Sequence, residues 1–129
     1  MTRTRGLAAA AVALGVMLGT GTVGATAGLH KRKPTAKRTM LVATVADPLT
    51  ISLTKRGRRV TKLKAGTYVI LVRDRASDHN FHLTGPGVDK VTSVGGKGAA
   101  RWKVKLVKGT YEYVCDPHAS FMKGSFTVS

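Results

Sequence analysis

The chain has 129 residues, of which 22 are lysine or arginine and only six are aspartate or glutamate, so its formal net charge at pH 7 is +16. This excess predicts attraction to anionic surfaces, such as wall polymers, lipid head groups or an acidic protein. Nucleic acid is not expected as a partner, because the lysines are scattered along expected strands and turns and not along a recognition helix. A nucleic-acid-binding function is therefore disfavoured from the outset.

Residues 1–27 are typical of a secretory signal peptide. A short basic start is followed by an apolar run from Leu7 to about Leu18 and by the small-residue cleavage pattern Ala25-Thr26-Ala27. An uncleaved membrane anchor is the alternative, since the apolar run approaches the length that spans a bilayer. We expect cleavage after Ala27 and export to a periplasmic, cell-wall-associated or extracellular location.

Residues 28–38, GLHKRKPTAKR, are polar and basic and contain a proline. This composition predicts a disordered linker that precedes one domain over residues 39–129.

From residue 39 onward the hydrophobic pattern has period two and is interrupted by turn residues, and no window has useful helical periodicity. Together with the basic turn 55–59, this pattern predicts an all-β fold, an antiparallel Greek-key β-sandwich of seven or eight strands. The expected strands are 39–46, 49–54, 60–63, 66–74, 79–85, 100–107, 110–115 and 125–129.

The last expected turn holds a group of metal-binding residue types. Cys115 is the only cysteine of the chain, and His118 and Met122 follow it within seven residues. An exported protein with one cysteine has either an intermolecular disulfide or a thiol with a specific task. Strand alternation places Cys115 on the same face as Tyr111 and Tyr113. A thiolate, an imidazole and a thioether favour soft or borderline transition metals, and electron-transfer copper uses two histidines, a cysteine and a distant methionine.

The second histidine must come from the segment DHNFHL, which contains His79 and His82. On an unbroken strand these two residues point to opposite faces. His79 shares its face with Phe81, an expected core residue, so we assign His79 to the site, with a bulge that re-aims His82 as the alternative. Asn80 is expected to hydrogen-bond to the cysteine loop and to join the two segments.

These motifs resemble those of the cupredoxins, the small blue copper proteins that include plastocyanin, amicyanin and pseudoazurin. The resemblance extends over essentially all of residues 39–129 and rests on HN at 79–80, CDPH at 115–118 and MKGSFTV at 122–128. It implies one copper ion per chain, bound by His79, Cys115, His118 and Met122.

The sequence also departs from the cupredoxin pattern. Three residues separate His118 from Met122, fewer than in plastocyanin and more than in amicyanin. Val114 replaces the tyrosine that precedes the cysteine in plastocyanin. An acidic patch is also missing. By resemblance, the exposed edge of His118 is the electron port, and Pro117, Ala119 and Phe121 form an apolar collar around it.

The resemblance implies a monomeric protein that shuttles single electrons between redox partners and catalyses no net reaction. A partner with an acidic docking surface is expected, because lysines would steer such a surface toward the port. One alternative is a copper-binding module that buffers or delivers the metal without redox turnover. Another is a basic, wall-associated β-domain with a vestigial site. Zinc bound by the same cysteine and histidines is less favoured, since structural zinc sites rarely use methionine.

Overall fold

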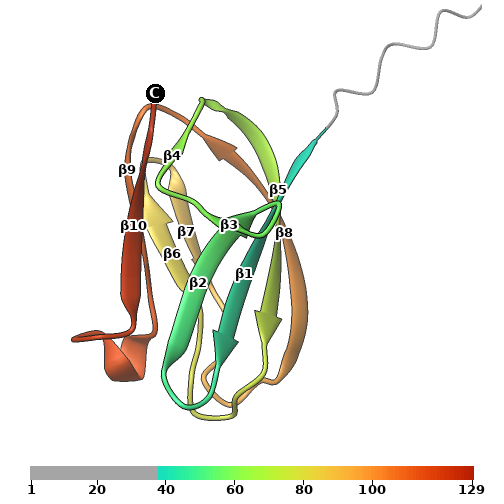
Figure 1. Ribbon diagram of the computed structural model, residues 1–129, viewed down its shortest axis with the longest axis vertical. Helices are drawn as coiled ribbons and strands as arrows, with labels where there is room; N and C mark the ends of the chain where they lie inside the picture. Colours follow the sequence, from blue (N-terminus) through green and yellow to red (C-terminus); the bar gives the residue numbers. More distant parts are fainter. Residues whose placement is uncertain (1–37) are drawn as a thin grey trace, which may run out of the picture. The chain divides into compact units, whose positions relative to one another are not determined.

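The computed structural model describes residues 38–129, and the predicted signal peptide and nearly all of the predicted linker lie outside this range. Two five-stranded sheets pack face to face (Figure 1), and the described residues include no α-helix. The strands are β1 (Thr39–Ala46), β2 (Thr50–Lys55), β3 (Arg58–Arg59), β4 (Lys62–Leu63), β5 (Gly66–Asp74), β6 (His82–Gly85), β7 (Val88–Val91), β8 (Gly98–Leu106), β9 (Gly109–Val114) and β10 (Lys123–Val128), with one 3-10 turn, η1 (Asp116–His118).

The strand order is β3-β2-β1-β5-β8 in one sheet and β4-β10-β9-β6-β7 in the other. The all-β sandwich predicted from the sequence is confirmed. The prediction that it is antiparallel throughout is wrong, because β1 pairs in parallel with β5 and β4 pairs in parallel with β10. Parallel partners lie far apart in the sequence, so a local hydrophobic pattern does not reveal them.

The described residues form ten strands, more than the seven or eight expected. The short β3 falls inside the predicted basic turn, and β7 has only one buried residue, so neither produces a period-two pattern. The segment 79–81 was expected to be strand, but β6 begins only at His82. Within the part of the chain that is described, no helix is long and apolar enough to cross a membrane.

The core consists of the side chains that alternate inward from both sheets. Tyr113 stacks on Phe81 with ring centroids 5.5 Å apart, and Tyr111 stacks on Phe126 at 5.3 Å. All four aromatic side chains are buried. This core continues to the end of the sandwich where β5 and β9 finish, and η1 lies at that end (Figure 1).

Candidate metal centre

The loop after β9 is held by backbone hydrogen bonds between its own residues. The amide of His118 donates to the carbonyl of Cys115 at 3.0 Å, and the amide of Met122 donates to the carbonyl of His118 at 2.9 Å. The amide of Cys115 in turn donates to the carbonyl of Met122 at 2.9 Å. These three bonds fix the positions of the three candidate ligands relative to one another.

Strand alternation correctly predicts the direction of the cysteine side chain. Cys115 is fully buried, as are Tyr111 and Tyr113 on the same face of β9, and its thiol is free. Pro117 lies within η1, where a proline stabilises the start of a helical turn. The chain therefore bends immediately after Cys115 and brings His118 back over the sulfur.

His79 approaches the loop from the segment before β6. Its side chain is 1% exposed, and its Nδ1 lies 3.6 Å from the sulfur of Cys115. Its Nε2 lies 3.1 Å from the carbonyl oxygen of Pro48. Because a carbonyl only accepts hydrogen bonds, this contact places the ring proton on Nε2 and leaves the Nδ1 lone pair directed into the site.

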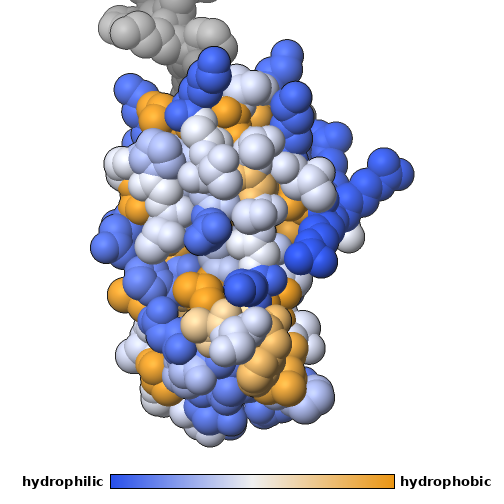
Figure 2. Space-filling view, turned by 90° about the vertical axis from the view of Figure 1, so that its left-hand side faces the viewer, coloured by the Kyte–Doolittle hydropathy of each residue, from blue (hydrophilic) through white to orange (hydrophobic). Residues whose placement is uncertain are grey.

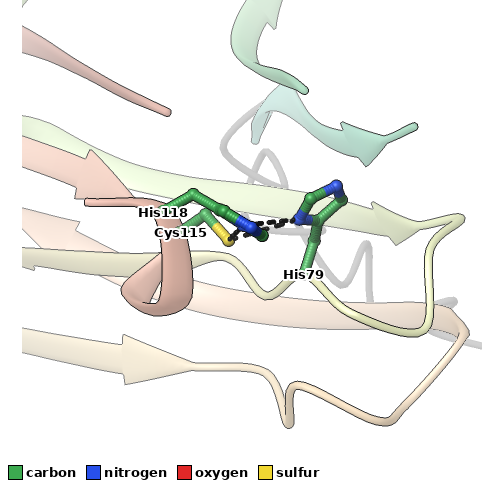
Figure 3. A group of neighbouring side chains, drawn as sticks. All are labelled: His79, Cys115 and His118. Carbon is green, nitrogen blue, oxygen red and sulfur yellow. Dashed lines mark hydrogen bonds between the residues drawn. The ribbon is translucent and has the colours of Figure 1, made fainter. Parts of the chain in front are cut away.

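The three side chains converge on one point (Figure 3). The two Nδ1 atoms of His79 and His118 are 3.0 Å apart, and each lies 3.6 Å from Sγ of Cys115. The centre of such a triangle lies about 2 Å from each corner, close to the bond length between a first-row metal ion and an imidazole nitrogen. The donor set therefore fits one metal ion, and its thiolate favours a soft or borderline ion.

Met122 lies beside this group as the last residue of the loop. Its side chain is 1% exposed and packs within the core cluster that also contains Cys115. The thioether is a weak ligand suited to soft metals. The sequence assigned Met122 to the site, and its burial next to the cysteine is compatible with that assignment.

Asn80 joins the two segments that carry the site. Its side-chain amide donates to Oδ2 of Asp116 at 2.7 Å, and its carbonyl oxygen accepts the backbone amide of Asp116 at 2.8 Å. The predicted hydrogen bond to the cysteine loop is confirmed. Asn80 is buried although Asp116 is exposed, and the two bonds fix the distance between the segments that carry His79 and Cys115.

His82 points away from the group formed by His79, Cys115 and His118. Its Nδ1 and Nε2 each lie 2.9 Å from a carboxylate oxygen, of Asp116 and Asp89 respectively. The hydrogen bond with Asp116 raises the pKa of His82; burial opposes this shift, and the bond with Asp89 adds to it. Burial tends to raise the pKa of Asp116, but its hydrogen bonds with Asn80 and His82 outweigh burial and lower it. The imidazolium form, which donates from both nitrogens, suits this position.

Two contacts of the site were not anticipated from the sequence. Pro48 lies between the first two expected strands, and nothing in its sequence neighbourhood indicates that its carbonyl would orient His79. Asp116 lies in the last expected turn, and its carboxylate connects Asn80 with His82. Its position directly after the cysteine was the only available signal.

A second group of potential ligands lies on the outer side of His79. The carboxylates of Asp47 and Asp78 are 3.5 Å and 3.8 Å from Nε2 of His79, and both side chains are 66% exposed. That nitrogen already faces the carbonyl of Pro48, and exposed carboxylates are weak ligands without further donors. We assign no metal to this group.

The surface around His118 is apolar. His118 is half-buried, and its ring lies 5.6 Å from the ring of Phe121, which is 60% exposed. Pro117 and Ala119 are also exposed. Figure 2 shows a hydrophobic patch at the lower end of this face, at the level of η1 in Figure 1. The expected apolar collar is therefore present as exposed side chains beside His118.

Comparison with known proteins gives a family and a set of similar solved structures. Residues 58–129 match the family of copper binding proteins described as plastocyanin/azurin. No curated protein gives a significant sequence match.

The similar solved structures include several of rusticyanin. A methionine-to-glutamine variant has a TM-score of 0.53 at 20% identity, with 70% of this chain and 76% of that chain covered. Reduced rusticyanin has a TM-score of 0.51 at 19% identity, covering 70% and 78%. Rusticyanin from Thiobacillus ferrooxidans has a TM-score of 0.50 at 20% identity, covering 70% and 76%. At this level of identity the likeness concerns the fold.

Proposed function

The chain belongs to the plastocyanin/azurin family of copper-binding proteins, and from this membership we propose that it is an exported type 1 copper protein that carries single electrons between redox partners. The ligands in this proposal are His79, Cys115, His118 and Met122. The observation that carries it is the triangle of two imidazole nitrogens and one buried sulfur, with 3.0 Å and 3.6 Å sides.

When bound, copper would hold or release one electron by cycling between Cu(I) and Cu(II). The protein contributes a site whose donors are already assembled. Backbone bonds fix the loop 115–122, and Asn80 fixes the separation between that loop and His79. Donors held in this way need little rearrangement when the charge changes, which favours fast transfer over catalysis. No net reaction is assigned to the protein.

His118 is the proposed point of electron entry and exit. Of the three triangle residues it alone is partly exposed, while His79 and Cys115 are buried. The exposed ring of Phe121 and the neighbouring apolar residues give a redox partner a surface from which water is readily displaced. Export is proposed from the signal-like residues 1–27.

An optical titration with Cu(II) followed by ascorbate tests the proposal. We expect an intense blue or green band that saturates at one copper per chain, bleaches with ascorbate and returns with an oxidant. Copper binding without this band would exclude Cys115 as a ligand. A band that cannot be reduced and restored would instead favour a copper-buffering or copper-delivery module.

A further inference from the structure

Nine of the sixteen basic side chains in residues 38–129 lie toward the end of the sandwich opposite the metal centre. The sequence ranges toward this end, 38–40, 54–68 and 104–110, contain no aspartate or glutamate. They include the β2–β3 hairpin, β4 and the β8–β9 turn, which lie in the upper half of Figure 1, whereas η1 and the β1–β2 turn lie at the lower end. We call this end the basic pole; its residues are Arg38, Lys55, Arg56, Arg58, Arg59, Lys62, Lys64, Lys105 and Lys108.

The carboxylates are distributed in the opposite way. Four of the six lie at or near the metal centre: Asp47, Asp74, Asp78 and Asp116. Every ion pair within residues 38–129 joins an aspartate to His79 or His82. The charges of the basic pole are therefore not neutralised by acidic side chains of the domain and remain available to an external anionic partner.

The two ends are well separated. β5 runs from the basic pole to the metal centre with nine residues, which corresponds to about 30 Å at the rise of a strand. The Debye length at physiological ionic strength is about 8 Å. Charged groups at the metal centre therefore have little direct electrostatic effect on a partner that is bound at the basic pole.

The shape of the basic pole suits a surface better than a linear polymer. Its charges come from turns of both sheets, so they are spread over a whole end of the domain and do not line one groove. Two exposed apolar side chains lie among them, Met40 at 44% and Val107 at 40% exposure. A hollow of about 210 Å³ is lined by Arg38, Thr39, Met40 and Arg56. Basic groups next to exposed apolar groups match a bilayer, where anionic head groups lie over hydrocarbon.

We propose that the basic pole binds the surface of an anionic lipid bilayer and so holds the metal centre on the side of the domain that faces away from the membrane. Four more basic residues, at positions 31, 32, 33 and 37, precede Arg38 in the sequence. In this arrangement the basic pole faces the membrane, and the apolar surface around His118 remains accessible to the redox partner. It does not depend on bound copper.

Vesicle partitioning with a pair of charge-matched variants tests the proposal. The first variant, Arg58→Gln/Arg59→Gln/Lys62→Gln, removes three charges from the basic pole, and the second, Arg75→Gln/Lys97→Gln/Lys123→Gln, removes three elsewhere. All six side chains are exposed, so both variants are expected to fold. Residues 1–37 are the same in every protein, so any binding by that segment is common to all.

Phosphatidylglycerol/phosphatidylcholine vesicles are compared with phosphatidylcholine vesicles alone. We expect wild type to prefer the anionic vesicles, with binding that weakens as salt increases. Each basic residue near such a surface contributes about 1 kcal/mol, so the basic-pole variant should partition roughly 100-fold more weakly. The control variant should lose much less.

Three results would overturn the proposal. Equal losses in the two variants would mean that only net charge matters. The absence of a preference for anionic vesicles would exclude a lipid surface. Displacement from vesicles by soluble polyphosphate at equal phosphate concentration would indicate a linear polyanion as the partner.

A second experiment tests the orientation of the domain on the membrane. With copper bound, reduction by a neutral hydroquinone should be equally fast with and without vesicles, and strong slowing on vesicles would mean that the metal centre faces the membrane. Because partitioning is measured without copper, its failure is distinguishable from failure of the electron-transfer proposal.

Discussion

The two segments that form the metal centre are positioned in different ways. The loop from Cys115 to Met122 is closed by hydrogen bonds among its own residues. His79 has no such local support; the carbonyl of Pro48 orients its ring, and Asn80 ties its segment to Asp116. The loop is thus a local structure, whereas the position of His79 depends on contacts with residues more than 30 positions away.

This difference indicates where the site is robust and where it is fragile. Changes within the loop should remove a ligand but leave its neighbours in place. Changes around His79 should alter the distance between the two segments, because few bonds determine it. The following predictions test this contrast, starting with the largest expected effect.

Replacement of Cys115 by serine should abolish the charge-transfer band completely, because a hydroxyl does not supply the thiolate. The absorption spectrum with Cu(II) measures this. Circular dichroism of the metal-free variant is the control, and it should show the strands retained. A persistent intense band would mean that the sulfur is not bound to copper.

The two histidines of the segment DHNFHL should behave in opposite ways. His79→Gln should remove the band or weaken copper binding at least tenfold, because a nitrogen corner of the triangle is lost. His82→Gln should leave the band nearly intact, since His82 faces Asp116 and Asp89. Copper titration of both variants gives the comparison, and the reverse result would assign the ligand to His82.

Removal of the Asn80 side chain should loosen the connection between the segments. Asn80→Ala loses both hydrogen bonds to Asp116, which predicts a loss of about 1–3 kcal/mol in the free energy of unfolding and roughly 10- to 100-fold weaker copper binding. Asp116→Ala is the matched comparison, because its backbone amide can still donate to Asn80. It should weaken copper binding less, as measured by copper competition; an equal effect would show that the carboxylate bond alone matters.

The pH dependence of stability should reveal the ion pairs of His82. The pKa of His82 is raised above 6.5 in the folded protein. The stabilisation of the fold by charged His82 is therefore complete below pH 6.5 and is lost as the pH rises through the folded-state pKa. The pKa of Asp116 is lowered from 3.8 in the folded protein. The stabilisation by its carboxylate is therefore present above pH 3.8 and is lost as the pH falls through the folded-state pKa.

Denaturant unfolding of the metal-free protein at a series of pH values measures this dependence. The free energy of unfolding of wild type should decline above about pH 6.5, and His82→Gln should lack that decline. An identical profile in both proteins would contradict the charged state inferred for His82.

The smallest effect is expected at Tyr113, whose ring stacks on Phe81 and so packs the two segments together. Its hydroxyl is buried without a hydrogen-bond partner in the described residues. Tyr113→Phe keeps the ring and removes the unsatisfied group, so stability should be unchanged or rise by up to about 1 kcal/mol. Thermal unfolding checks this, with Tyr113→Ala, which removes the stack, as the destabilised control; a clear loss in Tyr113→Phe would reveal a bound water or another partner of the hydroxyl.

The class of the fold and the local part of the site can be predicted from the amino-acid sequence alone. Period-two hydrophobicity predicts strands, and β9, which ends just before Cys115, has the predicted inward face because alternation is a property of the backbone. The spacing of Cys115, His118 and Met122 brings them together within one short turn. Even the choice of His79 over His82 followed from the neighbouring Phe81, although the strand expected there begins only at His82.

The contacts between distant segments cannot be predicted in this way and become visible only in the folded domain. The parallel pairing of β1 with β5, the carbonyl of Pro48 behind His79 and the bridge from Asn80 through Asp116 to His82 all join residues that no local pattern connects. The basic pole also depends on the tertiary structure, because strand pairing brings the ranges 54–68 and 104–110 to the same end of the sandwich. Local periodicity reports which face a side chain occupies, whereas its neighbours across the sheet depend on how the strands pair.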